Sequence, residues 1–214
     1  MRLFRNPDLI ILLSVVMFAV TGGSLVGPIL PEMIAPLGAT QKTIGWALSA
    51  YTLFAMLATP ILGVVADRAG RKRVIVAATL LFGAAGLLIG FSRSFWVVLV
   101  LRALQGIGVG GMMNTVVAAL GDLYSGTERN RAMGYRITTQ SLTNATVPFV
   151  SGVLATLAWF IPFFIHALAI PAGLLAAWKL RETSRQEKQP DYLRRSLSAV
   201  AQPRALWLFF CNFM

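Results

Sequence analysis

The sequence has little charge, one cysteine and one histidine, and each scarcity excludes a class of protein. Charged residues make up 13% of the 214 residues and hydrophobic residues 57%, whereas a water-soluble domain carries about 25% charged residues. The single cysteine, Cys211, excludes an intrachain disulfide and a cysteine-based metal site. The single histidine, His166, excludes a multi-histidine metal site. No nucleophile paired with a base and no phosphate-binding loop is recognisable, so we expect no enzyme and no cofactor.

Acidic residues are scarce as well: the chain has 19 Lys and Arg residues but 8 Asp and Glu residues, which gives a net charge of +11. Such a balance is typical of nucleic-acid-binding proteins when the cations form one face or stripe. Here the cations occur in short groups between uncharged runs, so we expect no nucleic-acid partner. The mean hydropathy of +0.71 predicts instead a protein that resides in the lipid bilayer.

The sequence is rich in apolar runs of membrane length. A helix needs about 20 apolar residues to cross a hydrocarbon core of about 30 Å. Six spans satisfy this requirement. Two of them share residues 137–178, a run long enough for two spans, which we divide around 158–162 because Pro162 suits the first turn of a helix. The other four are residues 9–30, 43–66, 74–91 and 95–121, and a polar stretch follows at 122–136. We therefore expect an all-α transmembrane six-helix bundle.

The positions of Lys and Arg predict how these spans are oriented. Six crossings place Lys42 and Arg93 on one side and Arg102 inside a span, whereas every other cation falls on the opposite side. Because cytoplasmic segments carry the excess of Lys and Arg, the N-terminus and the end of the sixth span are predicted to be cytoplasmic. We expect a multi-pass protein of the plasma (inner) membrane.

Charges gather between the second and third spans, in residues 63–72, GVVADRAGRK. Asp67 falls at the end of a helix, where an acid meets the negative end of the helix dipole at a cost of up to about 1 kcal/mol unless a cation offsets it. Arg71 lies one turn further on, beyond Gly70, whose tolerance of positive φ lets the chain reverse tightly. Asp122 lies at the same end of the fourth span and can share this cation. We therefore predict a cytoplasmic latch of Asp67, Arg71 and Asp122.

These residues also carry a family resemblance. The stretch resembles the signature G-x-x-x-D-R-x-G-R-[KR] of the major facilitator superfamily, with Gly63, Asp67, Arg68, Gly70, Arg71 and Lys72 at the defined positions. The fourth span resembles the family pattern R-x-x-Q-G-x-G through Arg102, Gln105, Gly106 and Gly108, and Gly22, Pro28 and Pro31 give a weaker match at the end of the first span. The resemblance implies two inverted three-helix repeats, a latch that favours the state closed to the inside, and a contact of Asp67 with the missing C-terminal half.

Several residues allow two interpretations at this point. Gly106 and Gly110 suit close helix packing of the small-xxx-small kind and suit the lining of a cavity equally well. Arg102 either serves a function, as an anion site or in a proton relay, or snorkels outward to the interface, and we favour the function. His166 is interpreted as packing rather than as a proton carrier. Gln105 is expected to face the central cavity together with Arg102.

The fifth span indicates the type of transporter. Proton-driven exporters of the family often carry G-P-x-x-G-G there, and this chain keeps Pro148 and Gly152 of that signature and lacks its other glycines. Asn144 and neighbouring Ser and Thr residues make the span polar, as the lining of a water-filled path would be. The first span has no acid in its middle, and Glu32 lies near its outer end. We expect proton-coupled export of a drug or small organic solute, with uptake symport and a non-transporting membrane scaffold as alternatives.

The last part of the sequence predicts the organisation of the chain. Residues 1–178 form the six-helix bundle, and the charged residues 179–204, with Pro190 and Pro203, fit a cytoplasmic connecting segment. Residues 205–214 are apolar again but too short to cross a bilayer. We expect them to begin a seventh helix of a longer transporter, whose partners are a small-molecule substrate, protons, the lipid bilayer and the C-terminal half.

Overall fold

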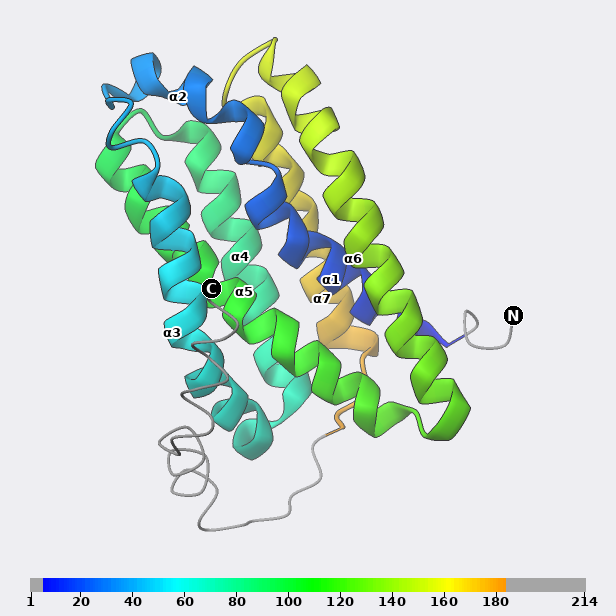
Figure 1. Ribbon diagram of the computed structural model, residues 1–214. Coiled ribbons are helices and arrows are strands. Elements are labelled where there is room, and N and C mark those ends of the chain that lie inside the picture. Colours follow the sequence, from blue (N-terminus) through cyan, green and yellow to red (C-terminus); the bar gives the residue numbers. More distant parts are fainter. Residues whose placement is uncertain (1–5, 184–214) are drawn as a thin grey trace, which may run out of the picture. The chain divides into compact units, whose positions relative to one another are not determined.

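The computed structural model describes residues 6–183, and within this range every regular element is a helix (Figure 1). The prediction of an all-α fold is confirmed. Arg2, Arg5, Cys211 and the predicted seventh helix at 205–214 lie outside the described residues, as does most of the predicted connection at 179–204. The elements are α1 (Pro7–Ser24), η2 (Gly27–Ile29), α2 (Leu30–Leu37), α3 (Trp46–Ala69), α4 (Arg71–Phe91), α5 (Phe95–Leu123), α6 (Gly126–Ala155), η3 (Ile161–Leu168) and α7 (Ala169–Lys179).

The first span is longer than its apolar run predicts. The Asn6 side chain accepts a hydrogen bond from the Asp8 backbone N–H at 3.1 Å and caps α1, and Pro7 occupies the first turn, where no intrahelical N–H is needed. The helical path then continues through η2 and α2 and ends at Gly38, whose φ of +63° closes α2. The stretch Pro7–Leu37 is therefore one span of 31 residues with Glu32 toward its C-terminal end.

The charged stretch between the second and third spans is almost entirely helical. α3 continues to Ala69 and α4 begins at Arg71, so the turn between them is the single residue Gly70, with a φ of +108°. A side chain would be strained at this φ, and the glycine predicted to reverse the chain does so. The charges of the signature therefore lie in the last turn of one helix and the first turn of the next.

The polar stretch 122–136 contains the turn between two helices, but most of it is helical. α5 runs to Leu123 and α6 begins at Gly126, so most of the stretch forms the first turns of α6. Polarity by itself does not end a helix, and Glu128 suits the positive end of the α6 dipole. α6 is also too polar to be counted among the five helical stretches of residues 6–183 that are long and apolar enough to cross a membrane. It nevertheless runs alongside α1 for most of its length (Figure 1).

The packing of the long helices fits a half-fold made of two repeats. Consecutive long helices run in opposite directions, so that α2 lies at one end of the bundle and the turn from α3 to α4 at the other (Figure 1). α3 packs on α5, and α6 packs on α1. In span order, α3 and α5 are the second and fourth spans, and α6 and α1 are the fifth and first. A twofold axis that relates the first three spans to the last three converts one pair into the other, as predicted for inverted repeats.

The interior consists of two apolar clusters with a polar layer between them. One cluster contains Val15, Ile75 and Val116, and the other contains Met33, Ile89 and Phe163. Buried polar side chains occupy the positions where three elements pass from one cluster to the other: Thr21 on α1, Arg102 and Gln105 on α5, and His166 on η3. These four polar groups are therefore buried inside the spans rather than at their ends.

Candidate functional site

The glycines of α5 bring two neighbouring helices against its backbone. A Cβ added at Gly106 would collide with the Tyr51 carbonyl oxygen, and one at Gly110 would lie 2.8 Å from the Ala55 carbonyl oxygen, both on α3. On another face of α5, a Cβ at Gly108 would lie 2.9 Å from the Ala78 carbonyl oxygen of α4. Gly106 and Gly110 therefore have the surroundings expected for close helix packing. The close approach of α3 to α5 offsets the low helix propensity of glycine.

Arg102 points into the bundle and is fully buried. Its Nε donates a hydrogen bond to the Ala47 carbonyl oxygen at 3.3 Å, and one terminal nitrogen donates to Gln105 Oε1 at 2.8 Å. The guanidinium carbon lies 4.4 Å from the centre of the Tyr51 ring, within the range of a cation–π interaction. Snorkelling does not describe this side chain, because none of it reaches the surface. The second terminal nitrogen, Nη2, has no hydrogen-bond partner among residues 6–183.

The remaining members of the polar layer lie close to this pair. A Cβ added at Gly86 of α4 would lie 2.5 Å from Gln105 Nε2 and 2.5 Å from the Cβ of His166, so the missing side chain makes room for both. His166 packs between two aromatic rings, with the Phe82 ring centre at 5.1 Å and the Phe163 ring centre at 5.9 Å. The packing interpretation of His166 agrees with this environment.

The predicted residues of the fifth span do not join this cluster. Asn144 Oδ1 accepts a hydrogen bond from the Ser24 hydroxyl at 2.8 Å and so links α6 to α1. Pro148 lies inside α6, where its carbonyl oxygen accepts a hydrogen bond from Ser151. A Cβ at Gly152 would meet no atom within 4 Å. Within the described residues, no hydrogen bond connects these three positions to Arg102.

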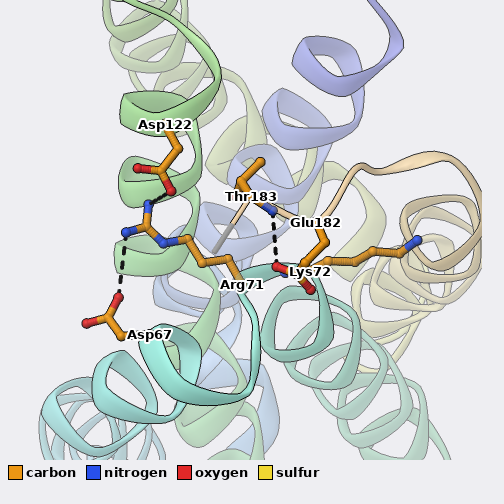
Figure 2. A network of polar contacts seen from close by, with 6 residues as sticks. All are labelled: Asp67, Arg71, Lys72, Asp122, Glu182 and Thr183. Atoms are coloured by element: carbon orange, nitrogen blue, oxygen red, sulfur yellow. Dashed lines mark hydrogen bonds and ion pairs between the residues drawn. The ribbon is translucent and has the colours of Figure 1, made fainter. Parts of the chain in front are cut away.

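Arg71 brings together the three residues of the latch predicted from the sequence (Figure 2). One terminal nitrogen of Arg71 lies 2.6 Å from Asp122 Oδ2, and the other lies 3.6 Å from Asp67 Oδ1. The cation therefore joins α3, α4 and α5 at one end of the bundle. The Asp122 contact is the stronger of the two, because it is shorter and the Asp122 side chain is 26% exposed compared with 43% for Asp67.

The other residues of the signature have different surroundings. Arg68 is exposed in the last turn of α3, where a cation suits the negative end of the dipole. A Cβ at Gly63 would meet no atom within 4 Å. At Gly70, a Cβ would collide with the Glu182 carboxylate. Gly70 is therefore required both for its positive φ and for its lack of a side chain.

Sequence reasoning missed the acid that contacts this turn. Glu182, just after α7, accepts hydrogen bonds through Oε1 from the Lys72 backbone N–H at 3.3 Å and from the Thr183 backbone N–H at 3.1 Å (Figure 2). Its carboxylate thereby satisfies an otherwise unpaired N–H in the first turn of α4 and suits the positive end of that helix. Lys72 of the signature thus contacts Glu182 through its backbone N–H.

Sequence reasoning also missed Asp8, a fully buried carboxylate in the first turn of α1. Its Oδ2 accepts a hydrogen bond from Arg181 Nε at 2.8 Å, and its Oδ1 accepts one from the Arg181 backbone N–H at 3.2 Å. Burial, followed by the nearby Asp8 carboxylate, raises the pKa of the Tyr124 phenol, so this ring stays neutral. Arg181 and Glu182 are adjacent, and together they connect the end of α7 to the starts of α1 and α4. We call this pair of contacts the α7 clasp.

Comparison with known proteins agrees with these features. The family model described as Major Facilitator Superfamily matches residues 12–214. The Multidrug transporter protein MdtP of Bacillus subtilis (strain 168) is 31% identical over 77% of this chain and 30% of its own length. The Bacillibactin exporter of the same organism is 30% identical over 73% of this chain and 40% of its length. The Quinolone resistance protein NorA of Staphylococcus aureus (strain Mu50 / ATCC 700699) is 26% identical over 80% of this chain and 44% of its length.

The chain thus spans less than half the length of these relatives. The match covers all the helices that the structure describes apart from residues 7–11 of α1, and it includes both sequence signatures. The family consists of membrane transporters of small molecules rather than of enzymes, which agrees with a multi-pass protein. With an all-α bundle, a buried polar layer and the Arg71 latch in place, this chain belongs to the Major Facilitator Superfamily.

Proposed function

We propose that this chain is the N-terminal half of a secondary transporter that exports a small organic solute or drug by alternating access, coupled to protons. The observation that carries the proposal is Arg102, a fully buried cation about two turns into the α5 span. A charge costs at least about 2.5 kcal/mol at the centre of a span on insertion scales, and ionisable residues buried within spans mark substrate and ion pathways. Its unpartnered Nη2 can bind an anionic group of the substrate or respond to a proton that moves nearby.

Export is favoured over uptake by the names of the relatives. The similar proteins are named as a multidrug transporter, an exporter and a quinolone resistance protein. Alternating access also requires a closure that can open, and the Arg71 latch provides one at a single end of the bundle. The partner for that closure is the C-terminal half, which we place against the exposed apolar faces of α3 and α6.

Transport by the full reading frame in everted membrane vesicles tests this function. A fluorescent lipophilic cation should accumulate when a pH gradient is imposed, and a protonophore should abolish the accumulation. Arg102→Ala should abolish it at unchanged expression, because the polar layer loses its charge. The matched control is Arg93→Ala, an exposed cation that should leave accumulation unchanged. Wild-type rates in Arg102→Ala, or accumulation without any gradient dependence, would contradict the proposal.

We also propose that the chain lies in the plasma membrane with its N-terminus cytoplasmic. With Cys211 replaced by Ser, a cysteine at exposed Lys42 should react with an impermeant thiol reagent added to intact cells. A cysteine at Arg68 should react only after the cells are permeabilised. Arg68 is a better reporter than Arg71, since Arg71 is held in ion pairs. The opposite labelling pattern would overturn the orientation.

A further inference from the structure

A groove of about 310 Å³ lies between α3 and α4, with α5 as its floor. Its walls are aliphatic side chains and alanines, including Leu62, Val74, Leu81 and Ile107. A further residue of its wall is Arg73, the one charged residue among those that line it. The groove therefore combines an apolar lining with a single cation.

The groove exists because glycines on two different faces of α5 hold α3 and α4 close to that helix. Gly106 and Gly110 draw α3 against α5, while Gly108 and Gly111 draw α4 against a different face. Ile107 projects between these two faces and forms the floor. Small residues on the facing sides of α3 and α4, such as Ala77, leave the space between the two helices unfilled.

Arg73 is placed to bind a negative group at the mouth of this groove. It lies in the first turn of α4, is exposed, and makes no ion pair with any residue of the range 6–183. The carboxylates that contact this turn are already engaged, since Asp67 contacts Arg71 and Glu182 binds the start of α4. A cation at the interface next to an apolar groove matches a phospholipid, which has a negative phosphate joined to hydrocarbon.

We propose that this groove binds one acyl chain of an anionic phospholipid, with the lipid phosphate on Arg73. The lipid belongs to the cytoplasmic leaflet if the orientation proposed above holds, but its binding does not depend on transport. The bound lipid would fill the space between α3 and α4 and pair the cation. This assigns a lipid contact to the residue that directly follows the signature stretch, next to the Arg71 latch.

Native mass spectrometry of the purified chain, with phosphatidylglycerol or phosphatidylethanolamine added, measures the headgroup preference. Phosphatidylglycerol should bind more tightly, and Arg73→Gln should weaken its binding about fivefold, the effect of about one interfacial cation. Arg131→Gln, which removes an exposed cation of α6, should leave binding unchanged. Inorganic phosphate should not compete, because it has no chain for the groove. Equal binding of the two lipids, or an unchanged affinity in Arg73→Gln, would overturn the proposal.

A second pair of variants tests the acyl chain. Ala77→Phe should fill the groove and reduce lipid binding, whereas Ala84→Phe, at an exposed position two turns further along α4, should not. A photo-crosslinking residue at position 77 in the full-length protein should capture lipid. Capture of another part of the polypeptide would overturn the proposal and identify the C-terminal half as the occupant. Failure of transport with intact lipid capture would refute the proposed function alone.

Discussion

The ion pair of Asp8 and Arg181 predicts an unequal response to its two possible deletions. Asp8 is 0% exposed in its side chain and Arg181 is 70% exposed. Removing Arg181 leaves a buried carboxylate without its cation, whereas removing the charge of Asp8 leaves an arginine that is already in water. The cost therefore depends on which partner remains.

The structure sets the magnitudes. Breaking a buried pair costs about 3–5 kcal/mol when a charge stays buried. Arg181→Ala should lie near the lower limit, at about 3 kcal/mol, because the Arg181 backbone N–H still donates to Asp8 Oδ1. Asp8→Asn loses charge-assisted hydrogen bonds without stranding a charge, so we expect about 1.5 kcal/mol. The double variant should resemble Asp8→Asn alone, since no carboxylate then remains to be stranded.

Equilibrium unfolding in mixed detergent micelles measures these free energies. Arg131→Ala, an exposed cation on α6, is the control and should change the free energy of unfolding by less than about 0.5 kcal/mol. Equal costs for the two single variants, or strictly additive costs in the double variant, would refute the argument that the buried carboxylate dominates.

Three further outcomes are expected. In the longer transporter proposed above, Asp122→Asn should shift the distances between the two halves at the latch end toward the open state more than Asp67→Asn does, because the Asp122 contact with Arg71 is 2.6 Å and the Asp67 contact is 3.6 Å. Equal distance distributions in the two variants would argue against the latch. Gly106→Ala should lower stability in micelles by about 1–3 kcal/mol through overpacking, whereas Gly152→Ala, with open space around it, should be near neutral or stabilising. Glu182→Ala should speed hydrogen exchange at the first amides of α4, and unchanged exchange there would exclude its capping role.

The features that the sequence predicts well are those that local composition decides. The apolar runs and the glycine turn at Gly70 are readable because bilayer thickness and backbone sterics act on neighbouring residues. The proximity of Arg71 and Asp122 is also predictable, because alternating spans bring both residues to the same end.

The remaining features depend on how each helix is rotated about its axis, which the sequence does not specify. Rotation decides that Arg102 turns inward rather than toward the interface. It also brings Asp8 and Arg181 together, and neither residue belongs to a recognisable motif. The apolar run that begins at position 137 does not indicate where its helix starts, since polar residues extend α6 back to Gly126.

The α7 clasp has a consequence for the order of assembly in the membrane. Asp8 and Arg181 are 173 positions apart, so the first span is synthesised long before its cation exists. An unpaired carboxylate is costly to bury, and Asp8 therefore stays in interfacial water until Arg181 arrives. We infer that α1 reaches its final depth only after α7 has inserted, although α1 is synthesised earlier than α7.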